Sequence, residues 1–164
     1  MTDLPPITVE APDDFDAVEA LIDQAFGPGR YAKSAERLRE GNSHLSGVSV
    51  VAREGGAVVG CARMWPVKVG DKAAVLLGPF AVADSKRNKG LGIALVEAAC
   101  AAAKDAGHGL VILVGDAPFF QRAGFKPVDP KAVVFPGPVD MRRVLTRALK
   151  SGAADGLKGA VTRG

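Results

Sequence analysis

The chain has 164 residues, of which 48% are hydrophobic and 24% are charged. This length and composition predict one folded domain over residues 1–164, with enough apolar surface to bury a core. The net charge is +3 and aromatic residues make up 5% of the chain. These values argue against a nucleic-acid partner, because domains that bind nucleic acids normally carry a denser basic face with stacking aromatics.

Neither the cysteines nor the first residues indicate export or membrane attachment. Cys61 and Cys100 lie in apolar segments, which predicts buried, reduced thiols and no structural zinc site. Met1 to Pro5 contain neither a basic segment nor an apolar run, so no signal peptide is expected. No apolar run approaches the ~20 residues that span a bilayer. We therefore expect a cytoplasmic protein with no metal and no membrane partner.

The N-terminal part of the chain predicts one strand and two helices. A short strand is expected from Ile7 to Glu10. Asp13 is expected to cap the following helix, with Asp16 as its partner in a capping box. Gly27-Pro28-Gly29 is expected to end that helix, and a second short helix is expected from Lys33 to Arg39.

The central part changes to β-branched and aliphatic runs. Strands are expected at Val48 to Arg53, Ala57 to Val69 and Ala73 to Val82. The separators Glu54-Gly55-Gly56 and Gly70-Asp71-Lys72 have the composition of hairpin turns. The three strands are therefore expected to form an antiparallel meander.

The last part of the chain alternates helices and strands. A helix with an alanine-rich face is expected from Gly90 to Ala106. The later elements are expected to be a strand at Leu110 to Val114, a helix at Ala117 to Ala123, and strands at Lys126 to Phe135 and Val139 to Leu145. The tail from Ser151 is rich in glycine and alanine and is expected to be loosely ordered. The order β-α-α-β-β-β-α-β-α-β-β predicts an α/β fold with a mixed, mostly antiparallel sheet flanked by helices.

The segment from Leu77 to Gly92 carries the features of a binding site. It predicts a strand, a basic turn and a helix that begins with glycines, which leave the first amides of the helix open to a ligand. Together with the helix dipole these amides form a phosphate-binding site, and Lys86, Arg87 and Lys89 add positive charge. Pro79 has no N–H, so a bulge or a splayed strand is expected there.

Two nucleotide-binding motifs fit the sequence less well. The dinucleotide fingerprint needs a third glycine where Leu95 stands. The stretch Gly27 to Ser34 imitates a Walker A loop, but Ala32 replaces the glycine before the lysine, and the stretch follows a helix. Both readings are therefore disfavoured.

The run Arg87-Asn88-Lys89-Gly90-Leu91-Gly92 resembles the (Gln/Arg)-x-x-Gly-x-(Gly/Ala) signature of the GNAT superfamily of acyl-CoA-dependent N-acyltransferases. The strand before this run resembles the fourth strand of that family. Val111 to Val114 resembles the fifth strand, and Phe119 to Phe125 resembles the following helix, which commonly ends in Gly-Phe.

Three further phrases resemble a branch of predicted bacterial acetyltransferases often called YhbS-like. They are Leu77-Gly78-Pro79, Gly115-Asp116-Ala117-Pro118 and Pro136-Gly137-Pro138-Val139. The resemblance runs from about Ile7 to Val161, which is nearly the whole chain.

The resemblance implies an N-acetyltransferase that moves an acetyl group from acetyl-CoA to a primary amine by direct attack on the thioester. The acceptor would be a small molecule or a peptide, and the protein would act as a monomer or homodimer without a metal. Backbone groups of Phe80, Ala81 and Val82 would hold the pantetheine arm like an added strand. The pyrophosphate would lie on the backbone amides of Arg87, Asn88, Lys89, Gly90, Leu91, Gly92 and Ile93.

The resemblance leaves the general acid open. The family often carries a tyrosine where Phe120 stands, and Phe120 has no proton to give. Tyr31, the one tyrosine of the chain, lies in the loop that usually lines the acceptor pocket of this fold and is a weak catalytic candidate. The alternative function is a non-catalytic acyl-CoA-binding or sensing module that lacks this acid.

Four other residues near the predicted site have no assigned role. His44 is a candidate base, whereas His108 follows a helix cap and is expected to be structural. Arg63 and Trp65, on a central strand, are candidates to shape the acceptor pocket.

Overall fold

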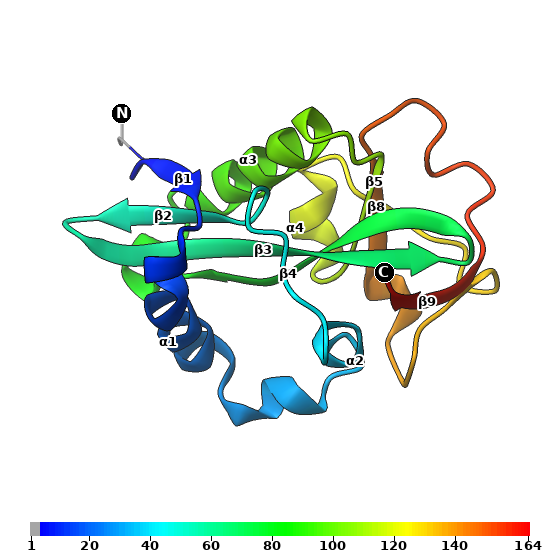
Figure 1. The fold of residues 1–164 in the computed structure, drawn as a ribbon, viewed down its shortest axis with the longest axis horizontal. Helices are drawn as coiled ribbons and strands as arrows, with labels where there is room; N and C mark the ends of the chain where they lie inside the picture. Colours follow the sequence, from blue (N-terminus) through cyan, green and yellow to red (C-terminus); the bar gives the residue numbers. More distant parts are fainter. Residues whose placement is uncertain (1–3) are drawn as a thin grey trace.

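A long mixed sheet runs through the structure, a computed structural model that describes residues 4–164 (Figure 1). Its strands follow the order β1-β2-β3-β4-β5-β8-β6, in which β4 and β5 pair in parallel and the other neighbours pair antiparallel. In chain order these strands are β1 (Ile7–Val9), β2 (Val50–Glu54), β3 (Ala57–Val69), β4 (Lys72–Val82), β5 (Leu110–Val114), β6 (Lys126–Pro127) and β8 (Val144–Ala148). The predicted mixed, mostly antiparallel sheet is confirmed.

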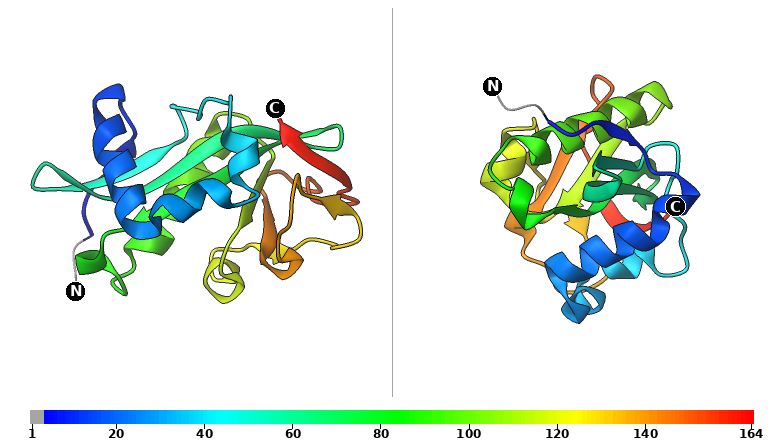
Figure 2. Two further views of the ribbon diagram at one scale, coloured as in Figure 1. Left: turned by 90° about the horizontal axis from the view of Figure 1, so that it is seen from below. Right: turned by 90° about the vertical axis from the view of Figure 1, so that its left-hand side faces the viewer.

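Helices cover both faces of this sheet. The α-helices are α1 (Phe15–Phe26), α2 (Glu36–Arg39), α3 (Leu91–Asp105) and α4 (Ala117–Gln121). Figures 1 and 2 show α1 and α2 on one face, and α3 and α4 on the other. Neighbouring residues of β3 point to opposite faces of the sheet, as strand geometry requires. Ala62 belongs to the hydrophobic core on the α3 side, and Cys61 belongs to the core on the α1 side.

α3 lies close against the sheet because its inner face is made of small residues. Ala99 and Ala103 of this face are fully buried. At Gly60 of β3 an added Cβ would lie 2.6 Å from Leu95 Cδ1, so a larger residue there would force the Leu95 side chain to move. The predicted helix and the predicted β2–β3–β4 meander are both confirmed.

The expected start of α1 is wrong by one residue. Pro12–Asp14 forms a 3₁₀ turn before the helix, and the Asp14 carboxylate accepts a hydrogen bond from the Ala11 N–H at 2.8 Å. Asp14 is therefore the N-cap residue of α1, but its side chain closes the preceding turn on Ala11 and makes no cap hydrogen bond to α1.

The expected second helix is shorter than predicted. Pro28–Ala32 forms a 3₁₀ turn and α2 begins only at Glu36. Ser34 donates a hydrogen bond to the Pro138 carbonyl, which holds this segment outside the helix.

The two strands expected after α4 are also broken up. Lys126–Pro127 and β7 (Val133–Val134) are short strands separated by a turn at Asp129, whose carboxylate accepts the Lys131 N–H at 2.9 Å. The strand expected from Val139 instead begins at Val144, because Asp140 caps the 3₁₀ turn Met141–Arg143.

The C-terminal tail is more ordered than its composition predicts. Gly159–Arg163 forms strand β9, which pairs antiparallel with Val67 to Val69 of β3 and parallel with β7. β3 extends beyond the end of β2 at this point, and Val161, 1% exposed, covers the free edge. The expectation of a loosely ordered tail is therefore wrong for this segment.

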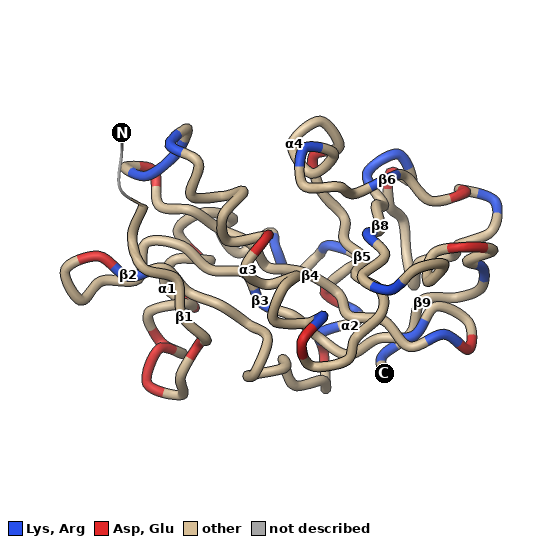
Figure 3. The backbone as a smooth tube through the Cα atoms, turned by 90° about the horizontal axis from the view of Figure 1, so that it is seen from above, with Lys and Arg blue, Asp and Glu red and all other residues tan. Residues whose placement is uncertain are grey.

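Charge is distributed unevenly along the molecule (Figure 3). Lys and Arg gather around β6, β8 and β9, whereas α1 and the turn before it carry acidic residues. Within residues 4–164 no helix has the length and apolarity to cross a membrane. The same residues contain no group of three or more His, Cys, Asp or Glu side chains that could hold a metal ion.

Candidate active site

The parallel strands β4 and β5 separate after two paired positions. They pair only at Val75 with Val111 and at Leu76 with Ile112. Beyond these positions Gly78 and Pro79 of β4 stand opposite the single residue Arg63 of β3, which is the bulge expected at Pro79. The bulge turns β4 away from β5, so the backbone of β4 on that side has no strand partner.

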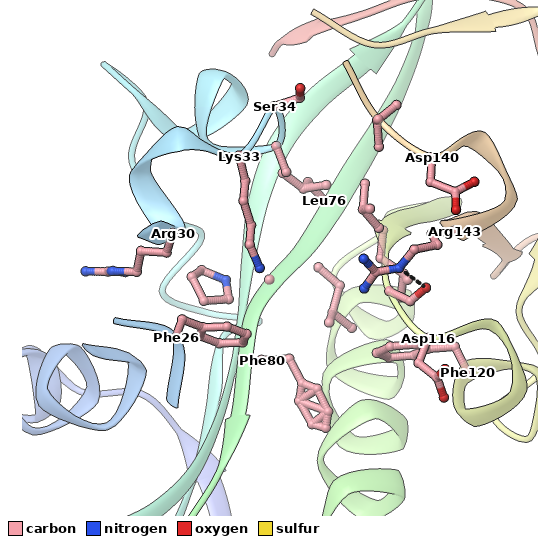
Figure 4. Close-up of a pocket in the computed structure, with 18 of the residues that line it drawn as sticks. Phe26, Arg30, Lys33, Ser34, Leu76, Phe80, Asp116, Phe120, Asp140 and Arg143 are labelled. Atoms are coloured by element: carbon pink, nitrogen blue, oxygen red, sulfur yellow. Dashed lines mark hydrogen bonds between the residues drawn. The ribbon is translucent and has the colours of Figure 1, made fainter. Parts of the chain in front are cut away.

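A cavity of about 420 Å³ fills this separation (Figure 4). We call it the β4–β5 cleft. Its walls are Gly78 to Phe80 of β4, Leu113 to Gly115 at the end of β5, and Phe119 and Phe120 of α4. The cleft is thus lined by unpaired strand backbone and by apolar side chains, which suits an extended ligand with amide groups.

The first turn of α3 begins beside the cleft. Gly90 caps the helix with φ of 87°, and no atom lies within 4 Å of an added Cβ there. Helical hydrogen bonding starts with Ala94 N–H donating to Gly90 O at 3.1 Å. The amides of Leu91, Gly92 and Ile93 therefore have no acceptor within the helix and, with the dipole, form a site for anionic groups.

Gly92 joins this helix end to the cleft. An added Cβ at Gly92 would lie 3.1 Å from Phe119 Cζ and 3.2 Å from Phe80 Cζ, and both rings line the cleft. Packing against these rings explains the second glycine of the motif, whereas the sequence suggested only close approach of a ligand.

The basic turn before α3 contributes less charge than the sequence suggested. Lys86 pairs with Glu54 at 2.5 Å, and Arg87 forms an exposed pair with Asp84 at 3.2 Å. Lys89 forms no salt bridge with any residue in the range 4–164. Two of the three basic side chains of this turn are therefore already paired within the protein.

Phe120 belongs to a cluster of aromatic rings on the cleft wall. It makes edge-to-face contacts with Phe80, Phe119 and Phe125, at centroid distances of 5.8, 4.9 and 5.8 Å. An added Cβ at Gly115 would lie 2.5 Å from Phe120 Cε2, which shows how tightly the ring is held. No hydroxyl stands at this position to protonate a leaving group.

A second cavity of about 430 Å³ lies on the other side of Pro79. We call it the Arg63 cavity. Four residues that the sequence singled out separately line it together, namely Tyr31, His44, Arg63 and Trp65. It shares Arg30, Arg39 and Pro79 with the β4–β5 cleft, so the two cavities are neighbours. His108 lines neither; its N–H donates to Ala103 O at 2.9 Å in the C-terminal cap of α3.

Arg63 is the centre of a buried charge cluster. It is 3% exposed and donates two hydrogen bonds of 3.1 Å to the Glu10 carboxylate and one of 2.7 Å to Glu19. Burial opposes its charge, but the hydrogen bonds and charges of Glu10 and Glu19 outweigh it, so the pKa of Arg63 is raised. The cluster fixes the wall of the Arg63 cavity and gives Arg63 a structural role.

His44 and Tyr31 are both engaged by neighbours. His44 Nδ1 lies 3.2 Å from Ser49 Oγ, and its Nε2 lies 3.6 Å from Glu10 Oε2. Burial, the largest cause, lowers the pKa of His44, although Glu10 opposes the shift. The Tyr31 hydroxyl accepts a hydrogen bond from Arg30 at 2.6 Å, and Tyr31 is 50% exposed. Neither side chain lines the β4–β5 cleft.

The cleft also contains charged residues that the sequence did not single out. Lys33, Arg39 and Arg143 line it, and they come from the segment before α2, from α2 itself and from the turn before β8. No local pattern joins these positions, so only the folded chain reveals their proximity.

An α/β domain with a bulged fourth strand, a splayed fifth strand and a glycine-rich helix start has the architecture of acyl-CoA-dependent acetyltransferases. The family described as "Acetyltransferase (GNAT) domain" matches residues 46–127. The chain belongs to this GNAT family of acetyltransferases.

Known relatives agree with this assignment. The protein described as the uncharacterized N-acetyltransferase YhbS of Escherichia coli K12 is 31% identical over 122 residues, which cover 73% of this chain and 72% of the relative. A crystal structure of YhbS from Escherichia coli in complex with CoA is 27% identical, with a TM-score of 0.83, and covers 100% of this chain and 92% of that one. A GNAT acetyltransferase from Brucella melitensis, in complex with acetyl-CoA, shares the fold with a TM-score of 0.69 at 23% identity, over 97% and 95% of the two chains.

Proposed function

We propose that the protein transfers the acetyl group of acetyl-CoA to a primary amine. The observation that carries the proposal is the β4–β5 cleft, an open gap between two parallel strands that meets the free amides of α3. The YhbS structure, which matches the whole chain, holds CoA. The thioester of acetyl-CoA supplies the acyl group and a thiolate leaving group.

In this proposal the chain binds the donor mainly through its backbone. Phe80, Ala81 and Val82 of β4 hold the pantetheine arm like an added strand, because β4 has no strand partner on that side beyond Leu76. The amides from Arg87 to Ile93 bind the pyrophosphate at the start of α3.

The residues around the bulge serve the transfer step. A backbone N–H of β4 next to Pro79 stabilises the negative charge that develops on the thioester oxygen when the amine attacks. Phe119 and Phe120 exclude water from this end of the cleft. The thiol of the product has an ordinary pKa of ~8.5, so the thiolate leaves without a general acid, at a slower rate.

A second candidate function is a non-catalytic acyl-CoA sensor. The observation that favours it is Phe120, whose buried ring replaces a proton donor. Such a sensor would bind acetyl-CoA in the same cleft and transfer nothing.

Turnover separates the two functions. The purified protein is incubated with acetyl-CoA and a panel of amines, and release of the CoA thiol and the mass of the acetylated amine are measured. Amine-dependent thiol release with an acetylated product supports the transferase. Tight binding of acetyl-CoA with no product across the panel supports the sensor.

A further inference from the structure

Two cations face the interior of the β4–β5 cleft from opposite walls. Lys33 precedes α2 and Arg143 ends the turn before β8, and both line the cleft. In Figure 4 the Lys33 ammonium and the Arg143 guanidinium point into the cavity, whereas the Arg30 guanidinium points away. Arg30 instead pairs with Glu19 and Asp23 of α1.

Uncharged contacts hold both cations in place. The Lys33 ammonium lies 5.0 Å from the centroid of the Phe26 ring, which also lines the cleft. Arg143 Nε donates a hydrogen bond to Gly115 O at 3.2 Å, which leaves its two terminal nitrogens to the cavity. Within residues 4–164 neither side chain forms a salt bridge, although the Arg143 charge contributes, after the bonds from Arg142, to lowering the pKa of Asp140.

The two carboxylates that line the cleft are used elsewhere. Asp116 caps α4 by accepting the Phe119 N–H at 3.2 Å. Asp140 accepts hydrogen bonds from the Arg142 side chain at 3.0 and 3.1 Å, and these bonds lower the pKa of Asp140. A third cation, Arg39, already pairs with Glu36 at 3.0 Å. Lys33 and Arg143 therefore form a positive pair at the cleft with which no carboxylate of residues 4–164 makes a salt bridge.

This positive site lies apart from the helix end that receives the pyrophosphate in the proposed function. Gly92 of α3 packs on Phe80 and Phe119. The lining of the cleft includes Lys33 and Arg143 but no residue of the helix start from Arg87 to Ile93. An acetyl group is uncharged, so the acetyl-CoA thioester brings no anion to this site. A simple cationic amine would be repelled there, because like charges in a cavity oppose each other.

We infer that the amine acceptor carries a carboxylate, and that Lys33 and Arg143 bind this carboxylate from opposite walls of the cleft. The inference rests on the proposed function and specifies its substrate class: small amino acids and not simple amines or polyamines. Arg143 offers two parallel N–H groups for a carboxylate, and Lys33 offers a point charge.

The test compares each amino acid with its own carboxamide, which keeps the amine and removes the negative charge. β-Alanine and 4-aminobutyrate are assayed with acetyl-CoA beside β-alaninamide and 4-aminobutyramide. The variants Lys33→Met and Arg143→Gln are compared with Lys104→Met and Arg122→Gln, which alter exposed residues that line none of the cavities described.

We expect kcat/KM for the amino acids to exceed that for the amides by ~10–100-fold, as for a hydrogen-bonded charge pair. Lys33→Met and Arg143→Gln should each reduce this preference by up to about fivefold, the effect of an exposed ion pair, because both side chains are exposed at the mouth of the cleft, while the KM for acetyl-CoA stays unchanged. The two control variants should keep the full preference.

Three results would overturn the inference. Equal rates with acids and amides would do so, as would variants that raise the KM for acetyl-CoA and leave the preference intact. A rate gain with succinyl-CoA that depends on Lys33 and Arg143 would place the anion on the acyl donor instead. In each case acetylation of amines would still uphold the proposed function. Where no amine in the panel is acetylated, the proposed function fails, and thermal-shift titration with the same acids and amides decides whether the carboxylate site exists.

Discussion

In the β4–β5 cleft the groups open to a ligand are backbone amides, strand carbonyls and phenylalanine rings, and two of its charged side chains, Lys33 and Arg143, form no salt bridge within residues 4–164. In the neighbouring Arg63 cavity the charged residues of the wall, among them Glu19, Arg30 and Arg63, form ion pairs with one another. The cleft is therefore a site built by the backbone, which tolerates many side chains. The Arg63 cavity is built by side chains that depend on their partners, so substitutions should affect the two regions in different ways.

Removal of Glu10 should give the largest effect. Glu10→Ala deprives the buried Arg63 of two of its hydrogen bonds, and an unpaired buried charge costs ~3–5 kcal/mol. Urea denaturation should show a loss near the lower end of this range, because Glu19 still contacts Arg63 at 2.7 Å. Acetyl-CoA affinity of the folded variant should stay unchanged.

The double variant Glu10→Leu with Arg63→Met is the control for this prediction. Replacing a buried pair with apolar residues is often neutral, so it should recover most of the lost stability. A decrease of less than ~1 kcal/mol in the free energy of unfolding of Glu10→Ala would contradict the account, because even exposed ion pairs contribute up to that much.

Introducing a hydroxyl at position 120 should change the rate of acetyl transfer and leave acetyl-CoA binding unaffected. Phe120→Tyr places a proton donor where related enzymes often carry tyrosine, and general acids contribute ~10²–10⁴-fold. We expect the rate of acetyl transfer to rise by up to ~10²-fold with acetyl-CoA affinity unchanged. Phe119→Tyr, on the neighbouring ring of the same wall, should not raise the rate. An unchanged rate in Phe120→Tyr would mean that loss of the thiolate does not limit turnover.

Enlarging Gly92 should disturb the cleft through packing. Gly92→Val forces Phe80 and Phe119 to move, and overpacking of this kind costs ~1–3 kcal/mol. We expect lower stability together with about tenfold weaker acetyl-CoA binding, since the same rings line the cleft. Ala101→Val on the exposed face of α3 has the same β-branched side chain and should cost only a helix-propensity difference of ~0.5 kcal/mol. Equal losses of stability and of acetyl-CoA affinity in the two variants would show that contact with the Phe80 and Phe119 rings does not cause the effect of Gly92→Val.

The smallest expected effect is a pH dependence of the free energy of unfolding, caused by His44 in the Arg63 cavity. Burial lowers the pKa of His44 from its ordinary value of 6.5, so the unfolded chain takes up a proton at higher pH than the folded chain does. The free energy of unfolding should therefore fall as pH drops below about 6.5. His44→Gln should show a shallower decline over this range in denaturation experiments. Parallel profiles for the two proteins would rule out this contribution.

The same contrast between the regions explains what the sequence could predict. The bulge at Pro79, the helix start at Gly90 and the strand before them lie within one short segment, and their geometry follows from local rules about proline, glycine and helix ends. The resemblance of that segment to the GNAT signature identified acyl-CoA as the expected ligand. The strand, the bulge and the helix start of the proposed cofactor site were therefore accessible from the sequence.

The acceptor side was not accessible in this way. Lys33 and Arg143 line the same cleft only because two turns that are distant in the sequence flank it. No sequence spacing of the kind seen within a helix or strand connects the two residues. Glu10, directly after β1, and Arg63 of β3 form a buried pair although they lie 53 residues apart in the chain. Strand β9 escaped prediction for a similar reason, because the free edge of β3 that it covers exists only in the folded sheet.

The central claim is that acetyl-CoA binds in the β4–β5 cleft with its pyrophosphate on the start of α3. Calorimetric titration of acetyl-CoA into wild type, Gly90→Glu and Gly107→Glu tests it most directly. Both glycines have positive φ (87° and 93°) and no atom within 4 Å of an added Cβ, so the variants carry the same strain and charge at opposite ends of α3. We predict binding by wild type and by Gly107→Glu, and a loss of at least ~10-fold in Gly90→Glu, where a carboxylate faces the pyrophosphate. No binding by wild type, or equal loss in both variants, would contradict the claim.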